Sequence, residues 1–267
     1  MAPTNRLLAL DLDGTVISLK LELDQRDVDA LARARDAGWH VVACTGRPYP
    51  GALPWVERLG LTDPFVCYQG AQVRERAGGM LLDHGVSREL AMEVIRWCRE
   101  RDLHVQGYRD DQLLVERDRP EARAYSQHSG MPIHVVEDLD TALGPTTPKV
   151  VIVGADQAVI ERILPDVREL WKDRLYAATS LPEYLELTAA NADKRRALEF
   201  LCERLGCHRE EAVAVGDGRN DQPMIEWAGT GVAVDTAPPE VLRVADRVIG
   251  PPGSAGIARL VEELLSQ

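Results

Sequence analysis

Two aspartates stand two positions apart, directly after an apolar run near the start of the chain. The stretch Leu-Leu-Ala-Leu-Asp-Leu-Asp-Gly-Thr occupies residues 7–15 and places Asp11 and Asp13 where a buried strand should end. Two like charges held this close are costly unless a cation, a proton or a reaction involves them. The pair therefore predicts a site where a carboxylate binds a metal ion or takes part in nucleophilic or acid–base chemistry.

Two further apolar runs end in polar residues of the same kind. Residues 40–44 are followed by Thr-Gly-Arg at 45–47, and residues 212–215 by Gly-Asp-Gly-Arg-Asn-Asp at 216–221. Because ligands of open parallel sheets bind beyond the carboxyl ends of the strands, we expect these side chains to meet at one edge. Oxygen ligands without histidine or cysteine favour Mg²⁺ over zinc. The candidate metal ligands are Asp11, Asp13, Asp217 and Asp221.

The same edge offers groups suited to a phosphate. Thr45 has a hydroxyl and Gly46 an unshielded backbone N–H, and both can donate to phosphoryl oxygens. Lys194 stands at the predicted start of a helix, and lysine is rare in this chain. A cation at a helix N-terminus is unfavourable against the helix dipole unless an anion lies nearby. Lys194 is therefore predicted to face the phosphate.

The elements that must position these residues alternate between strand and helix. Apolar runs without alternation, typical of strands buried on both faces, occupy residues 7–10, 40–44, 212–215 and 231–234. A further strand at residues 66–73 could form a hairpin with a strand at residues 80–82. Helical patterns fill residues 24–38, 50–60, 193–205 and 220–228. This order predicts an α/β fold with a doubly wound, mostly parallel, Rossmann-like core.

The middle of the chain has a different organisation. Short strand patterns mixed with helical ones predict an α+β module at residues 83–184, which interrupts the core formed by residues 1–82 and 185–267.

The composition limits the classes of partner. Hydrophobic residues make up 45% and charged residues 28%, which predicts a chain folded throughout. The formal net charge of −12 disfavours nucleic acids and anionic membranes, so neither is expected as a partner. No secretory pattern or membrane-length apolar run is present, and the five cysteines show no zinc-binding spacing, which indicates a cytoplasmic protein with reduced thiols. A monomer or a homodimer is equally compatible with these features.

The motifs together resemble one known family. Asp-Leu-Asp-Gly-Thr at 11–15, Thr-Gly-Arg at 45–47, Lys194 and the 216–221 segment occur in the order of the four motifs of the haloacid dehalogenase superfamily. The long insertion between the second and third motifs is similar to that of the Cof-type branch of Mg²⁺-dependent phosphatases, whose α+β cap lies in this interval. The resemblance implies hydrolysis of a small phosphorylated metabolite, such as a sugar phosphate, through an aspartyl-phosphate intermediate.

The resemblance also implies a role for each residue of the first three motifs. Asp11 would be the nucleophile and a Mg²⁺ ligand, and Asp13 the general acid and base, with its backbone carbonyl on the metal. Thr45 and Gly46 would bind the transferring phosphoryl group, and Lys194 would offset its charge.

In the fourth motif, Asp217 and Asp221 would hold the metal or its waters, and Asn220 would bind phosphate or substrate. Arg47 would face the substrate. The chain departs from the branch at Gln69, where an asparagine is usual, and at Arg195, where a glycine is usual, so its substrate is left open.

Simpler interpretations of single residues remain. Asp-x-Asp-Gly could begin a calcium-binding loop, but such a loop needs glycine at its sixth position, where this chain has Val16. Asp217 and Asp221 could serve only as helix N-terminal charges, and Thr45 and Asn220 as helix caps. Two other functions also stay open: a phosphomutase on the same scaffold, and a non-catalytic sensor of a phosphorylated ligand.

Overall fold

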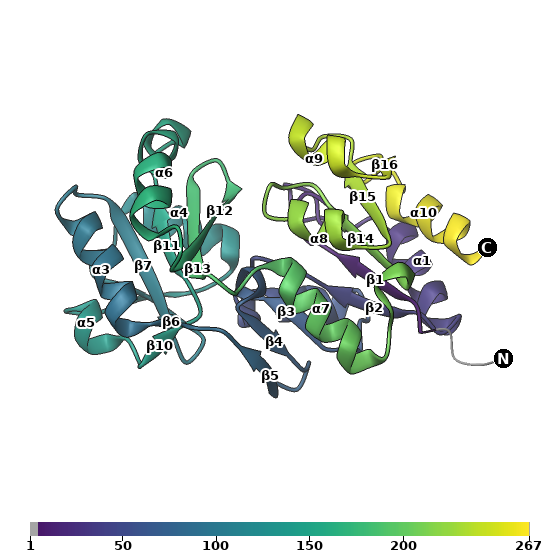
Figure 1. The fold of residues 1–267 in the computed structure, drawn as a ribbon, viewed down its shortest axis with the longest axis horizontal. Helices are drawn as coiled ribbons and strands as arrows, with labels where there is room; N and C mark the ends of the chain where they lie inside the picture. Colours follow the sequence, from purple (N-terminus) through teal and green to yellow (C-terminus); the bar gives the residue numbers. More distant parts are fainter. Residues whose placement is uncertain (1–4, 267) are drawn as a thin grey trace.

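The computed structural model describes residues 5–266 and has two α/β parts that lie side by side (Figure 1). The part that contains both chain ends is built on a parallel sheet of order β16-β15-β14-β1-β2. Its strands are β1 Leu7–Leu10, β2 His40–Ala43, β14 Ala212–Gly216, β15 Thr230–Val234 and β16 Arg247–Ile249. The doubly wound core predicted from the sequence is thus confirmed.

Helices cover both faces of this sheet because its strands are apolar on both sides. One face packs on α1 Gln25–Asp36, α2 Tyr49–Arg58 and α10 Gly256–Leu265. The other face packs on α7 Lys194–Leu205 and α8 Gln222–Trp227, and α9 Pro239–Val244 lies beside α8. Each face has its own hydrophobic cluster, and the side chains of β1 alternate between them. Leu8 and Leu10 pack on the face of α1, and Leu7 and Ala9 pack on the face of α7.

The strand expected at residues 66–73 is broken in two. β3 Phe65–Cys67 and β4 Gln72–Arg74 form an antiparallel pair, and β4 pairs onward with β5 Met80–Asp83. Between β3 and β4 the chain reverses through Tyr68, Gln69 and Gly70, whose φ angles are 52°, 60° and 96°. A Cβ on Gly70 would lie 2.2 Å from the backbone of Asp193, so only glycine fits at this close approach.

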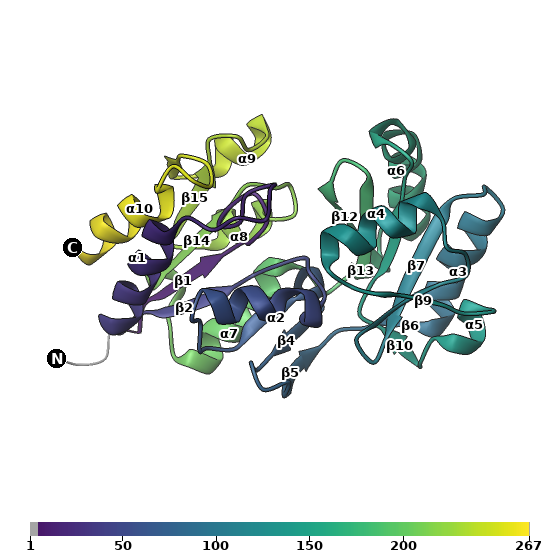
Figure 2. The ribbon, with the colours of Figure 1, turned by 180° about the vertical axis from the view of Figure 1, so that it is seen from behind.

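The second part is built on a mainly antiparallel sheet of order β12-β13-β11-β7-β8-β9. Its strands are β7 His104–Arg109, β8 Gln112–Val115, β9 Ile133–Val135, β11 Val150–Val153, β12 Leu175–Leu181 and β13 Tyr184–Ala189. The outer face packs on α3 Arg88–Arg99 and α6 Gln157–Trp171. Figure 2 shows α4 Pro120–Ser129 on the opposite side of this sheet.

Three short elements complete the second part: β6 Val86–Ser87 pairs with β10 Thr146–Thr147, and α5 Leu139–Ala142 precedes β10. The strand pairing bears on where this part begins and ends. A boundary at 184/185 would remove β13 from a sheet in which it pairs with both β11 and β12. We propose that the cap ends after Ala189, and that it begins near residue 83, where β5 ends.

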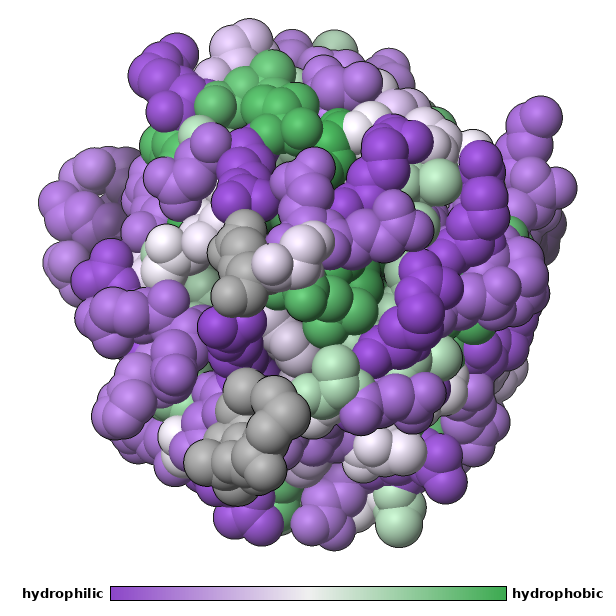
Figure 3. All heavy atoms as spheres, turned by 90° about the vertical axis from the view of Figure 1, so that its right-hand side faces the viewer, coloured by the Kyte–Doolittle hydropathy of each residue, from purple (hydrophilic) through white to green (hydrophobic). Residues whose placement is uncertain are grey.

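The surface at the end of the core is predominantly hydrophilic. Figure 3 shows the end of the core that faces away from the cap, where apolar patches are small and interrupted by hydrophilic side chains. Across residues 5–266, none of the helices has the length and apolar character that a membrane span requires. The five cysteines are free and buried, consistent with reduced thiols that pack as small apolar groups.

Candidate active site

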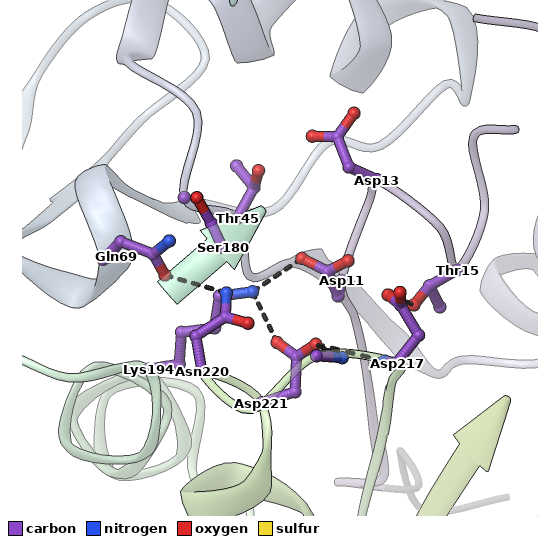
Figure 4. A network of polar contacts seen from close by, with 12 residues as sticks. Asp11, Asp13, Thr15, Thr45, Gln69, Ser180, Lys194, Asp217, Asn220 and Asp221 are labelled. Carbon is purple, nitrogen blue, oxygen red and sulfur yellow. Dashed lines mark hydrogen bonds and ion pairs between the residues drawn. The ribbon is translucent and has the colours of Figure 1, made fainter. Parts of the chain in front are cut away.

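Asp11 and Asp13 follow β1 at the carboxyl edge of the core sheet. The backbone N–H of Asp11 donates to the carbonyl of Val215, 2.9 Å away, so the parallel ladder holds Asp11 beside the end of β14. The Asp11 side chain is buried, whereas Asp13 points away from it (Figure 4). The two carboxylates therefore have different surroundings, as two different roles would require.

The segment after β14 brings two more carboxylates to this position. Asp221 is buried, and its Oδ2 accepts hydrogen bonds from the backbone N–H groups of Asp217 and Gly218 at 3.1 and 2.8 Å. Asp217 Oδ1 accepts from the Thr15 hydroxyl at 2.9 Å. Asp11, Asp217 and Asp221 each offer an oxygen, and these oxygens lie within 4.8 Å of one another. The three side chains form the carboxylate cluster of the site.

Lys194 is the buried cation of this cluster. It begins α7, and its Nζ lies 2.6 Å from Asp11 Oδ1 and 2.5 Å from Asp221 Oδ1 (Figure 4). Burial alone would lower the pKa of Lys194, but the two carboxylates outweigh it and raise that pKa above its usual range. The unfavourable position at a helix start is thus explained by the anions that face it.

One lysine does not neutralise three carboxylates. Burial, and then the charge of Asp221, raises the pKa of Asp11 well above its ordinary value. The same causes raise the pKa of Asp217 to about 7. The site therefore carries more negative than positive charge, and its candidate metal ligands are all oxygens. A hard divalent cation such as Mg²⁺ fits such an environment.

Thr45, Gly46 and Arg47 follow β2 at the same edge. The Thr45 hydroxyl oxygen accepts from the backbone N–H of Arg47 at 3.0 Å, which leaves the hydroxyl proton free to donate. Gly46 lines a cavity of about 50 Å³ together with Asp11, so its backbone lies beside the nucleophile candidate.

Arg47 lines the same cavity, but its guanidinium is engaged. Its Nε and Nη2 donate to the two carboxylate oxygens of Asp13 at 2.7 and 2.6 Å. Its Nη1 donates to the carbonyl of His128, in helix α4 of the cap, at 3.2 Å. Arg47 therefore connects the predicted acid–base residue to the cap.

Asn220 and Gln69 form an amide pair in the wall of the cavity. Asn220 Nδ2 donates to Gln69 Oε1 at 3.0 Å, which orients the Gln69 amide. Gln69 is 2% exposed, and its Nε2 has no hydrogen-bond partner among the described residues. Because Gln69 lines the cavity, this buried donor is available to a ligand there.

Sequence reasoning could not select the residues that the cap contributes to the cavity. Tyr125, His128, Ser180, Tyr184 and Glu186 all line it. Nothing local in the sequence marks them, because they come from α4, β12 and β13 and converge only in the folded chain. The sequence did mark Gln69 in part, because an asparagine is usual at this position in the resembled branch.

Comparisons with known proteins agree with this geometry. The model of the haloacid dehalogenase-like hydrolase family matches residues 8–261. The pyridoxal phosphate phosphatase YbhA of Escherichia coli is 27% identical, over 97% of this chain and 98% of its own. The 5-amino-6-(5-phospho-D-ribitylamino)uracil phosphatase YitU of Bacillus subtilis is 27% identical, over 97% of each chain.

Solved structures support the same assignment. A haloacid dehalogenase-like hydrolase from Bacteroides thetaiotaomicron superposes with a TM-score of 0.87 and 27% identity, over 97% of this chain and 99% of that one. The match extends through the cap as well as the core. The chain therefore belongs to the haloacid dehalogenase-like hydrolases, in the phosphatase branch of that family.

Proposed function

We propose that the protein is a Mg²⁺-dependent phosphatase that hydrolyses a small phosphorylated metabolite, a sugar phosphate or a related ester, through an aspartyl-phosphate intermediate. The observation that carries this proposal is the carboxylate cluster, whose members crowd around a single lysine. Relatives that act on small phosphate esters support it.

Asp11, Asp217 and Asp221 would hold the metal ion, with the backbone carbonyl of Asp13. When bound, Mg²⁺ supplies positive charge that lowers the repulsion between the carboxylates and an incoming phosphate dianion. The rest of the chemistry belongs to the chain's own side chains.

Asp11 is the proposed nucleophile. Its carboxylate oxygen attacks phosphorus, the bond from phosphorus to the leaving oxygen breaks, and Asp13 gives that oxygen a proton. In the second step, water attacks the phosphorus of the phosphorylated Asp11, Asp13 takes the proton of the water, and inorganic phosphate and free Asp11 are formed. Thr45 and Lys194 stabilise the charge of the transferring group by hydrogen bonding and by proximity.

Phosphate release from 4-nitrophenyl phosphate tests the proposal. We expect turnover with Mg²⁺, none in excess EDTA, and none in Asp11→Asn, whose amide cannot form the intermediate. The matched control is Asp36→Asn, which removes the same charge from an exposed position at the end of α1 and should keep full activity. Activity retained by Asp11→Asn would refute the mechanism. Isomerisation of a sugar phosphate without free phosphate would instead indicate a phosphomutase.

A further inference from the structure

The cap places a buried ion pair against the catalytic cavity. Lys149, just before β11, and Glu186, in β13, are 0% and 3% exposed, and Lys149 Nζ donates to Glu186 Oε2. The Ser180 hydroxyl donates to the other carboxylate oxygen of Glu186. Lys149 Nζ also donates to the carbonyl of Gly46, 2.7 Å away, in the core. Glu186 is therefore held in one orientation.

Only the negative partner of this pair faces the cavity. Glu186 lines it, whereas Lys149 is not among the lining residues and contacts the backbone behind them. Tyr184, two positions earlier on β13, lines the cavity from the same face of the strand, as strand alternation requires. The pair is neutral in sum, but it presents a carboxylate to whatever occupies the space beside Tyr184.

The other charges around the cavity do not compensate for this carboxylate. Among the described residues, the lining contains five carboxylates and one guanidinium, that of Arg47, which is already paired with both oxygens of Asp13. Burial lowers the pKa of His128, so its ring is uncharged near neutral pH. A metal ion in the carboxylate cluster would serve the phosphoryl group, and the described lining offers the leaving group no free cation.

We propose that Glu186 is a specificity-determining residue that restricts the protein to phosphate monoesters whose leaving group carries no second negative charge. This inference rests on the proposed function. A leaving group with hydroxyl or amide donors can hydrogen-bond to the Glu186 carboxylate, which keeps free lone pairs beside Ser180 and Lys149. A leaving group with a carboxylate or a second phosphate meets a like charge in a poorly solvated cavity, where repulsion is strong.

Two aryl phosphates that differ by one charge give the sharpest test. 4-Carbamoylphenyl phosphate and 4-carboxyphenyl phosphate have nearly the same shape, and only the second carries an extra anion. We expect the wild-type protein with Mg²⁺ to show a kcat/KM for the carbamoyl ester that is greater by on the order of tenfold or more, because one close like-charge contact is worth at least that factor.

The variant Glu186→Gln keeps the shape of the side chain and its acceptance of the Ser180 hydrogen bond, but it leaves the Lys149 cation without its anion. We expect the carbamoyl-to-carboxyl ratio to fall at least tenfold. Glu183→Gln, on the turn between β12 and β13 and outside the cavity lining, removes the same charge and should leave the ratio unchanged.

The carbamoyl-to-carboxyl ratio of the wild-type protein tests the inference even if Glu186→Gln does not fold. Equal hydrolysis of the two esters by the wild type would overturn the inference and leave the phosphatase function intact. An unchanged ratio in folded Glu186→Gln would overturn the assignment to Glu186. Absence of phosphate release from every ester, with Mg²⁺ present, would instead refute the proposed function itself.

Discussion

The metal-free protein should lose stability as the pH rises, because its carboxylate cluster ionises. Burial and the neighbouring Asp221 raise the pKa of Asp217 from 3.8 to about 7. Between these values the folded chain holds a proton that the unfolded chain releases, so the free energy of unfolding falls by about 1.4 kcal/mol per pH unit. Because Asp217 is already half ionised at pH 7, the loss from pH 5 to pH 7 is roughly 2 kcal/mol for Asp217 alone. The raised pKa of Asp11 acts in the same direction.

Urea unfolding in EDTA at pH 5 and pH 7 measures this effect. We expect Asp217→Asn to lose about 2 kcal/mol less than the wild type over this interval, because an amide does not titrate. Asp36→Asn, at its exposed position, should follow the wild type. Saturating Mg²⁺ should restore stability at pH 7 in the wild type more than in Asp217→Asn. Equal pH dependence in the wild type and Asp217→Asn would refute the account of the cluster.

Three further substitutions separate the roles at the site. Lys194→Met leaves two buried carboxylates without their cation, so urea unfolding in EDTA at pH 8 should show a loss of about 3–5 kcal/mol, and an unchanged midpoint would contradict the pairing. Asp13→Asn should keep its Mg²⁺ affinity by calorimetry while kcat falls by about 10²–10⁴, whereas a parallel loss of metal affinity would show that the Asp13 side chain binds the metal. Gln69→Met removes the unpartnered amide donor and should weaken inhibition by inorganic phosphate by about tenfold or more, while an equal inhibition constant would mean that Gln69 does not contact phosphate.

The core and its motifs could be predicted from the sequence because their signals are local. A fully buried parallel strand reads as an uninterrupted apolar run, and the functional residues follow at once where the run ends. The hydrogen bond from Asp11 to Val215 shows this rule at work, since two strands about two hundred residues apart end side by side. The order of the motifs then indicated the family.

Other features were not predictable because they depend on contacts between distant segments. The turn at Tyr68–Gly70 lies inside a run that looks like one strand, and the reversal depends on the close approach of Gly70 to Asp193. The ion pair of Lys149 and Glu186 joins residues 37 positions apart and has no spacing that marks it. The turn and the ion pair therefore both depend on tertiary packing, which local sequence patterns do not reveal.

The Thr45–Arg47 segment contacts the cap at two points. Lys149 of the cap donates to the Gly46 carbonyl, and the Arg47 guanidinium donates to the carbonyl of His128 in the cap. The cap therefore contacts both residues that form the Gly46–Arg47 peptide group. The Arg47 N–H of that peptide orients the Thr45 hydroxyl. A movement of the cap away from the core would break both contacts. We therefore expect the geometry of this candidate phosphate-binding segment to depend on the position of the cap, so that substitutions of the cap residues that make these contacts should change kcat as well as KM.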